Sequence, residues 1–296
     1  MSVVLETKLN FPLVHRGKVR DTYDIGDKLL LIATDRISAF DCVLPCGIPD
    51  KGLVLNQLSS FWFEKTKHIV PNHLITVVSS KNVLRKYLPP DIRLAEYFVG
   101  RSMIVRKAER VPIEAVVRGY ISGSGWTEYQ QYGTISGMLQ PKGMKESQKL
   151  SQPLFTPTTK ADAGRDMPLN KRELEELVGS RLARDLEEKS IALYQFASDY
   201  AQSRDIIIAD TKFEFGFIDG KLSLIDELLT PDSSRFWDAT QYVVGQAQLS
   251  YDKQPVRDWL IASGWNKEPP APTLPEKIIE ETSQRYRAAY KKLVGR

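Results

Sequence analysis

Three charged residues alternate along an otherwise apolar stretch of this chain. Asp210, Lys212 and Glu214 occupy every second position within IIIADTKFEFGF, residues 206–217. Side chains two positions apart on a strand point the same way, so a strand here would place an acid, a base and an acid on one face. The alternative is the solvated face of an edge strand. Residues 206–208 are apolar on both faces, which favours a covered strand.

More acids follow on the next predicted strand. Asp226 and Glu227 come directly after LSLI, and the segment TPDSSR adds Asp232 and Arg235. Acids that converge on a covered surface cost on the order of several kcal/mol each if they are unpaired. Mg²⁺ would remove that cost, because it takes one or two carboxylates and keeps places for water and phosphates. We therefore predict a magnesium site with Glu214 and Asp226 as ligands.

This metal site depends on the turn predicted at Asp219-Gly220. A two-residue turn would pair Phe213 with Asp226, so that Asp226 would face away from Glu214. A three-residue or bulged turn would place Glu214 opposite Asp226. The magnesium hypothesis therefore predicts a three-residue or bulged turn, and a clean two-residue hairpin would contradict this pairing.

Two glycine-containing segments could contact phosphates. Residues 17–20, GKVR, begin a predicted hairpin, where backbone amides and basic side chains could follow a polyphosphate. They form no Walker loop, because G-x-x-x-x-G-K-[ST] occurs nowhere in the chain. The segment VVRGYISGSGW carries Arg118 and Ser124 among three glycines, which suits a phosphate cradle. A basic surface hairpin and a flexible turn are the respective alternatives.

Other polar segments give weaker signals. Ser38 and Asp41 lie in TDRISAFD, where capping of a helix is the alternative, and Lys160 and Asp166 lie in TPTTKADAGRD, where a solvated loop is the alternative. The three histidines form neither a metal motif nor a Ser-His-Asp arrangement. This argues against covalent hydrolase chemistry and for phosphate chemistry with a metal.

The elements that must position these residues follow an α+β pattern, with strands in the first third and helices toward the end. We expect a domain boundary near residue 109, which separates residues 1–109 from 110–296. The stretch 107–120 is predicted as two strands interrupted at Pro112. Gly133–Asp166 is predicted as a long loop. The remaining predicted helices are 53–67, 170–205 with a break near Gly179, 234–246, 254–265 and a last one after Pro275.

Composition narrows the class of protein. The chain has 296 residues, 42% hydrophobic and 26% charged, with a net charge of +4. This mild excess suits anionic small molecules and is too small for a dedicated nucleic-acid binder. No apolar run approaches the ~18 residues of a membrane span, and the N-terminus lacks a secretory pattern. Cys42 and Cys46 are expected to be free thiols, and the protein to be cytoplasmic.

Six segments, in this order, resemble the SAICAR synthetase family of purine biosynthesis. They are GKVRDTYDI, ATDRISAFD, VPIEAVVRGYISGSGW, FTPTTKA, IIIADTKFEFG and IDELLTPDSSRFWD. The resemblance covers nearly the whole chain, and its most specific parts are D-x-K-x-E-F-G and P-x-E-x-x-x-R-x-x-x-x-G-S. Ser122 departs slightly, since the family more often has Thr or Ala there. SGSGW resembles the yeast-like branch more than the shorter bacterial branch.

The resemblance implies both a fold and a reaction. The fold would be α+β and two-lobed, with ATP in a cleft between an N-terminal β-rich lobe and a larger C-terminal α/β lobe, similar to protein kinases and ATP-grasp enzymes. ATP would phosphorylate the carboxylate of carboxyaminoimidazole ribotide (CAIR). The amine of L-aspartate would then attack the acyl phosphate, giving SAICAR, ADP and phosphate. The protein would be a monomer or small homo-oligomer whose partners are small molecules.

The resemblance also implies roles for individual residues. Lys212 and Asp210 would be the catalytic residues and would orient the imidazole and its carboxylate, and Glu214 and Asp226 would bind Mg²⁺. Asp210 is also a candidate for the base that deprotonates the amine of L-aspartate. The residues that it assigns to ATP are Gly17, Lys18, Val19, Arg20, Lys107 and Glu114. Those that it assigns to the 5′-phosphate of the ribotide are Arg118, Ser124 and Arg235. Those that it assigns to the L-aspartate side are Ser38, Asp41, Lys160 and Asp166.

Two other functions remain as alternatives from the sequence. A small-molecule kinase of related architecture would share ATP and magnesium but would need no amine acceptor. A nucleotide-binding or RNA-binding regulatory protein would expose aromatic side chains among basic ones. The clustered acids disfavour this second alternative.

Overall fold

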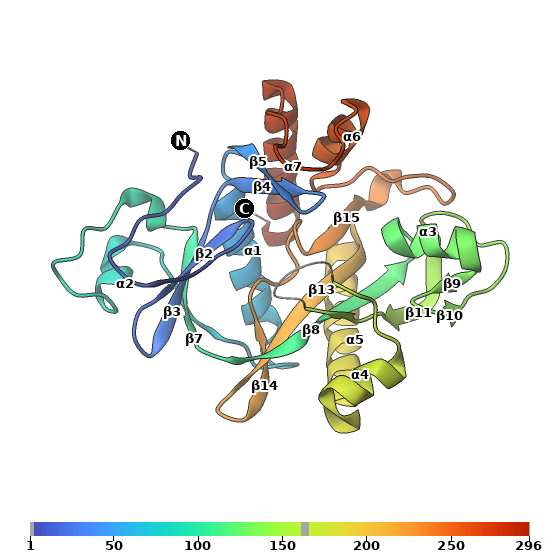
Figure 1. Cartoon of the computed structure of the whole chain (residues 1–296), viewed down its shortest axis with the longest axis horizontal. Helices are drawn as coiled ribbons and strands as arrows, with labels where there is room; N and C mark the ends of the chain where they lie inside the picture. The colour runs from blue at the N-terminus through green and yellow to red at the C-terminus, as the bar shows by residue number, and fades with distance from the viewer. Residues whose placement is uncertain (1–2, 161–165, 296) are drawn as a thin grey trace.

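The chain folds into two main antiparallel sheets with helices packed against them (Figure 1). The structure, a computed structural model, describes residues 3–160 and 166–295. Its strands are β1 (Leu13–Arg16), β2 (Arg20–Asp24), β3 (Lys28–Ala33), β4 (Arg36–Ala39), β5 (Cys42–Gly47), β6 (Leu74–Val77), β7 (Ser102–Arg106), β8 (Glu109–Tyr120), β9 (Thr134–Ile135), β10 (Met138–Leu139), β11 (Lys149–Phe155), β12 (Thr158–Thr159), β13 (Ile206–Ile218), β14 (Lys221–Ile225) and β15 (Ser234–Asp238). Its α-helices are α1 (Lys51–Thr66), α2 (Lys81–Arg85), α3 (Gly123–Tyr132), α4 (Lys171–Val178), α5 (Ser180–Gln202), α6 (Gln254–Ala262) and α7 (Glu276–Val294).

The order of the strands places the charged strand β13 inside a sheet. The first sheet runs β1-β2-β3-β7-β6, and the second runs β11-β8-β13-β14, with β12 beside β8 and β15 beside β13. Strand β13 therefore pairs with β8 along one edge and with β14 and β15 along the other. The prediction of a covered strand is confirmed, and so is the α+β class.

The hairpin between β13 and β14 contradicts the predicted bulged turn. Ile218 pairs with Lys221 and Phe217 with Leu222, which leaves Asp219 and Gly220 as a two-residue turn. Both turn residues have positive φ, 51° and 73°, as a type I′ turn requires. Glu214 pairs with Ile225, so Asp226 is not its cross-strand partner. The predicted register was wrong, because Asp-Gly supplies the two-residue turn without any bulge.

Helices bury the core on both sides of the proposed boundary. Helix α5 packs against β8 and β13, and α1 packs against β3 and α7 (Figure 1). The largest cluster of buried apolar residues extends from Leu31 to Leu293 and includes Trp62 and Phe213, both fully buried. The predicted break at Gly179 is confirmed, because its φ of 84° separates α4 from α5.

Several predicted elements differ from the structure. Segment 234–246 is the strand β15 followed by the 3₁₀ helix Ala239–Gln241, because Ser234–Asp238 pairs with β13 instead of coiling. Pro112 does not interrupt β8. It lies where the β8–β13 register shifts, and proline is tolerated at such irregularities because its missing N–H is not needed there.

The segments predicted as loops contain regular structure. The glycine-rich stretch after β8 begins helix α3, and the predicted loop 133–166 contains β9 to β12, while its residues 161–165 lie outside the described residues.

Cys42 and Cys46 are free, as predicted. Among the described residues, no helix is both long and apolar enough to cross a membrane.

Candidate active site

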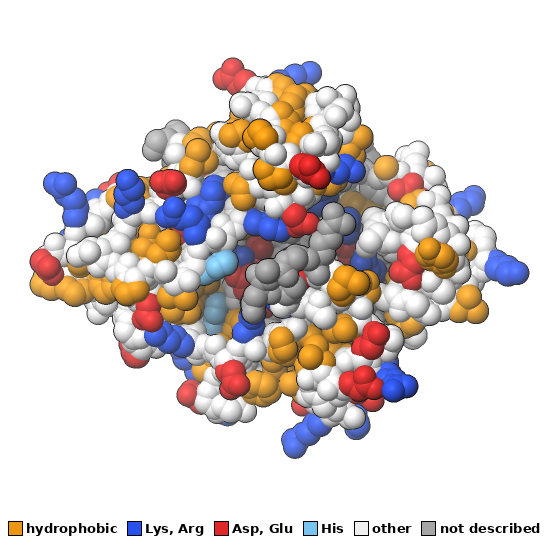
Figure 2. Space-filling model, viewed as in Figure 1, with side chains coloured by type: hydrophobic (Ala, Val, Ile, Leu, Met, Phe, Trp, Pro, Cys, Tyr) orange, Lys and Arg blue, Asp and Glu red, His pale blue; other side chains and the backbone are white. Residues whose placement is uncertain are grey.

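A cleft of about 1130 Å³ collects nearly all the predicted site residues. Figure 2 shows the hollow near the centre of this face, with basic side chains and histidines at its edge. Of the predicted residues, Lys107 does not line the cleft and instead pairs with Asp24 at 2.7 Å. Those that line it are Gly17, Lys18, Val19, Arg20, Ser38, Asp41, Glu114, Arg118, Ser124, Lys160, Asp166, Asp210, Lys212, Glu214, Asp226 and Arg235.

Asp210 is buried between two arginines from neighbouring strands. Arg235 on β15 donates from Nη1 to Asp210 Oδ2 at 2.5 Å, and Arg118 on β8 approaches the same oxygen at 3.5 Å. Ser122 Oγ also donates to it at 3.1 Å. Burial raises the pKa of Asp210, but the charges of the two arginines more than offset this, so its pKa lies below the usual value. Asp210 thus stays ionised and aligns both guanidinium groups.

The residues around these arginines form a compact anion-binding corner. Arg118 donates from Nη2 to Ser124 Oγ at 3.2 Å, which joins the three residues predicted for the 5′-phosphate. Gly123 lies against Arg235, and a Cβ placed on it would lie 2.4 Å from Arg235 Nη2. Its φ of 53° also favours glycine. The positive φ and the close approach of Arg235 therefore both favour glycine at this position.

Two lysines and two glutamates form the next layer of the cleft. Glu214 on β13 pairs across the sheet with Glu114 on β8, an arrangement of like charges that needs a cation. Lys160 supplies it, with its Nζ 2.6 Å from Glu114 Oε1 and 2.8 Å from Glu214 Oε1. Lys212 Nζ contacts the same oxygen of Glu114 at 3.0 Å. Burial raises the pKa of Glu114, but the two lysines lower it below its usual value.

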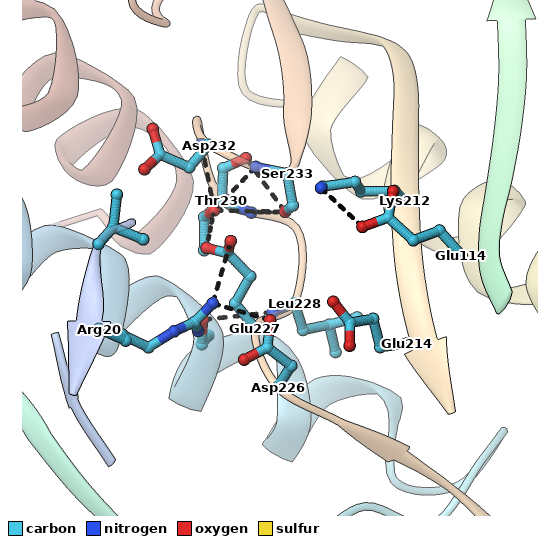
Figure 3. Close-up of polar contacts among 12 residues, drawn as sticks. Arg20, Glu114, Lys212, Glu214, Asp226, Glu227, Leu228, Thr230, Asp232 and Ser233 are labelled. Carbon is cyan, nitrogen blue, oxygen red and sulfur yellow. Dashed lines mark hydrogen bonds and ion pairs between the residues drawn. The ribbon is translucent and has the colours of Figure 1, made fainter. Parts of the chain in front are cut away.

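Asp226 lies near Glu214 although the two residues are not paired across the hairpin. Asp226 follows the end of β14 with a φ of 63°, and this left-handed residue turns the chain back toward the cleft. The carboxyl group of Glu214 points toward Asp226, which itself contacts Arg20 at 2.8 Å (Figure 3). Burial and the charge of Asp226 together raise the pKa of Glu214, while Arg20 keeps that of Asp226 below its usual value.

This acid pair offers hard oxygen ligands but not a complete metal cage. Among residues 3–160 and 166–295, no group of three or more His, Cys, Asp or Glu side chains is placed to hold a metal ion. Two carboxylates with one raised pKa fit a cation such as Mg²⁺, which takes its remaining ligands from water and phosphates.

Comparisons with known proteins agree with the motifs. The family model described as SAICAR synthetase matches residues 13–272. The chain belongs to the SAICAR synthetase family. A curated relative from Thermodesulfovibrio yellowstonii, named phosphoribosylaminoimidazole-succinocarboxamide synthase, is 51% identical over 99% of each chain. Family membership makes the chain a ligase of purine biosynthesis, as the sequence predicted.

Solved structures of SAICAR synthetases share the fold. The structure of SAICAR synthase from Saccharomyces cerevisiae complexed with SAICAR has a TM-score of 0.89 at 44% identity, covering 99% of this chain and 98% of that one. A SAICAR synthetase in complex with ADP has a TM-score of 0.69 at 24% identity, covering 95% of this chain and 97% of that one. At this identity the comparison supports the shared fold alone. The predicted likeness to the yeast-like branch is confirmed.

The cleft of this SAICAR synthetase also contains residues that were not predicted as site residues, among them Glu227, His73, Lys253 and Arg257. Glu227 contacts Arg20 at 3.2 Å, and its place beside Asp226 was the available signal. His73 is buried next to Asp226, and burial lowers its pKa to about 4, a position that no sequence motif marks. Lys253, just before α6, and Arg257, on α6, also line the cleft, and the helical pattern alone gave no hint of a site there.

Proposed function

We propose that this ligase condenses CAIR with L-aspartate at the expense of ATP through an acyl-phosphate intermediate. The observation that carries the proposal is the order of charged groups along β13. Asp210 lies under two arginines, Lys212 comes next, and Glu214 lies toward Asp226. A substrate with a phosphate at one end and a carboxylate at the other matches this order, because the carboxylate would then meet Lys212 and the acid pair.

The ribotide would bind with its 5′-phosphate against Arg118, Ser124 and Arg235. Supporting this, Asp210 holds both arginines by hydrogen bonds or ion pairs, so the cationic groups are oriented before a ligand arrives. The low pKa of Asp210 makes it a weak base. We therefore assign it the orientation of the arginines and the imidazole, and not removal of a proton from the amine of L-aspartate.

ATP would lie across the first sheet with its phosphates toward Gly17–Arg20. Arg20 is already held by two carboxylates, at 2.8 and 3.2 Å, so it would orient the acid pair as much as the phosphates. The apolar side chains of Leu29, Leu31 and Val105 line the same end of the cleft and suit an adenine ring. Residues 1–109 would thus act as a nucleotide-binding lobe and 110–296 as a substrate- and metal-binding lobe.

Glu214 and Asp226 would hold Mg²⁺, which when bound neutralises charge on the transferring phosphoryl group. Lys212 would contact the carboxylate of CAIR and reduce its repulsion from ATP. An oxygen of that carboxylate takes the γ-phosphoryl group and ADP leaves. The neutral amine nitrogen of L-aspartate then bonds to the acyl carbon as phosphate leaves, and the nitrogen releases one proton to solvent. Catalysis would rest mostly on positioning and charge neutralisation.

One assay tests the proposal directly. Protein, ATP, Mg²⁺ and CAIR are mixed with and without L-aspartate, and ADP is followed in time. We expect ADP release that depends on L-aspartate and a product with the mass of SAICAR. Release of ADP with a phosphorylated product and no need for L-aspartate would instead identify a kinase. Binding of nucleotide or RNA without turnover would identify a regulatory protein. We expect the reaction to take place in the cytoplasm.

A further inference from the structure

The proposed reaction brings four kinds of anionic group into one cleft, and three have cations assigned to them. The ribotide phosphate has Arg118 and Arg235, the ATP phosphates have Lys18 and Arg20, and the CAIR carboxylate has Lys212. The two carboxylates of L-aspartate need cations as well. Among the residues predicted for the L-aspartate side, Lys160 is already shared by two glutamates, and Asp41 and Asp166 would repel carboxylates.

Two cations outside the predicted set line the remaining wall of the cleft. Lys253 immediately precedes α6, and Arg257 lies one turn further along the helix. Their side chains are 14% and 28% exposed, so both reach the cleft from a largely buried position. This spacing of four residues places them on the same side of the helix.

Lys253 is poorly compensated by its surroundings. Its Nζ is 3.9 Å from Asp232, beyond hydrogen-bond distance, while Asp232 already accepts hydrogen bonds from Lys51 at 2.6 Å and Tyr286 at 2.5 Å. Burial and the nearby charges of Arg257 and Lys51 lower the pKa of Lys253, although Asp232 opposes this. An anion beside Lys253 would offset the unfavourable burial of its ammonium group and its repulsion from the neighbouring cations.

Arg257 has a carboxylate partner but keeps capacity for another. Arg257 Nη1 is 3.5 Å from Asp252 Oδ2 and donates to Gln254 Oε1 at 3.3 Å. A guanidinium group has five N–H donors, so these contacts leave room for a ligand carboxylate. In this described cluster, the cations Lys51, Lys253 and Arg257 lie near the carboxylates Asp232 and Asp252.

The chain before α6 holds this pair of cations next to the ribotide corner. Ser250 forms a bridge with Trp237 on β15, and Tyr251 N donates to Phe236 O at 2.8 Å. Strand β15 also carries Arg235, whose pKa is raised first by Asp210 and also by Asp252. Lys253 thus follows directly on a segment that is hydrogen-bonded to the strand bearing a predicted phosphate ligand.

We propose that Lys253 and Arg257 form a carboxylate subsite that binds L-aspartate and thereby selects a dicarboxylic amino acid as the acceptor. This inference rests on the proposed function, since it assigns a place to one of its substrates. The subsite would hold the carboxylates of L-aspartate so that its amine faces the acyl carbon of the ribotide. Both residues would bind substrate through charge-assisted hydrogen bonds and would take no part in phosphoryl transfer.

Steady-state kinetics of Lys253→Met and Arg257→Met tests the subsite. We expect each substitution to raise KM for L-aspartate by about ten- to hundredfold, as loss of a hydrogen bond to a charged group does. KM for ATP and for CAIR should stay within about threefold of the wild type. Lys253→Arg should restore much of the affinity, because it keeps the charge. Lys277→Met changes an exposed lysine of α7 and serves as the charge-matched control.

Succinate gives a readout without turnover, because it has both carboxylates of aspartate and no amine. Its affinity is measured by calorimetry with CAIR and an unreactive ATP analogue present. We expect binding to the wild type and to Lys277→Met, and weaker binding to Lys253→Met. Arg257→Met, at a more exposed side chain, provides the test if Lys253→Met does not fold.

Two outcomes would overturn the subsite. One is an unchanged KM for L-aspartate together with unchanged succinate affinity in both variants. The other is a rise in KM confined to CAIR or ATP, which would assign the cations to a phosphate. An inactive wild type that still binds succinate through Lys253 would reject the proposed function and leave the anion subsite standing, so the two failures are distinguishable.

Discussion

Asp232 and Glu214 are both buried acids paired with a lysine on the wall of the same cleft, yet their pKa values are shifted in opposite directions. Asp232 is 4% exposed and contacts Lys51, which is fully buried. Burial raises the pKa of Asp232, but Lys51 and Lys253 hold it well below its usual range. Glu214 shares Lys160 with Glu114 and lies toward Asp226, and its pKa is raised.

The two acids differ in whether nearby cations and hydrogen-bond donors neutralise the buried negative charge. Lys51 comes from α1, Asp232 from the loop before β15, and Tyr286 from α7, so this cluster joins three distant segments. Around Glu214, more negative charge is gathered than the nearby lysines neutralise. The first arrangement stabilises the fold, and the second is suited to a further cation. The following changes test this division.

Removing Lys51 from the cluster around Asp232 should have the largest effect. Lys51→Met removes the cation closest to the buried charge of Asp232 and leaves Lys253 Nζ 3.9 Å from it. We expect the free energy of unfolding to fall by about 3–5 kcal/mol, because breaking a buried pair leaves an uncompensated charge. Unfolding by urea measures it. The double variant Lys51→Met with Asp232→Asn should recover part of the loss, and a loss under about 1 kcal/mol would contradict a structural role.

Removing the lysine nearest the proposed reacting carboxylate should affect catalysis instead. We expect Lys212→Met to lower kcat by about 10²- to 10³-fold, or about 2.7–4 kcal/mol, as loss of one oriented charge-stabilising group does. Stability should change little, because Glu114 keeps Lys160 at 2.6 Å. Lys221→Met, at an exposed position on β14, is the control and should remain active. Survival of full activity in Lys212→Met would remove its proposed role.

The fold was predictable wherever a local pattern decides the structure. Helices α1, α5 and α7 follow from apolar periodicity, and the break at Gly179 follows from a residue that tolerates positive φ. Strand β15 was mistaken for a helix because Ser234–Asp238 becomes a strand only by pairing with β13, and a single-segment pattern cannot show a distant partner.

Most of the residues that line the cleft were predictable, but their geometry was less so. The sequence predicted that Glu214 and Asp226 lie in one site, and both line the cleft, yet the assumed bulged turn was wrong. Their approach depends on a left-handed backbone at Asp226, after the strand has ended, which strand register cannot describe. Lys253 could not be found from sequence, because its significance comes from Asp232 being already satisfied by residues from α1 and α7.

Neutralising Glu214 should weaken the binding of Mg²⁺ without lowering the stability of the fold. In Glu214→Gln, Lys160 keeps Glu114, and the repulsion from Asp226 disappears. We expect the Mg²⁺ concentration for half-maximal activity to rise by about ten- to hundredfold. Stability measured without Mg²⁺ should not fall. A large loss of stability would show that Glu214 belongs to the same structural class as Asp232, and the comparison would fail.

The smallest expected effect is on the pH dependence of stability, compared between the wild type and Asp232→Asn. Because the folded pKa of Asp232 lies below its unfolded value, its contribution to stability is present above about pH 4 and is lost as the pH falls through the folded pKa. The stability difference between the wild type and Asp232→Asn should therefore be constant from about pH 7 to 5 and shrink below about pH 4. Asp219→Asn changes a side chain that is 86% exposed and serves as the control. Its free energy of unfolding should fall at acid pH in the same way as that of the wild type. A difference that stays constant down to pH values of about 3 would mean that the Lys51–Asp232 pair does not hold the ionised form as the structure indicates.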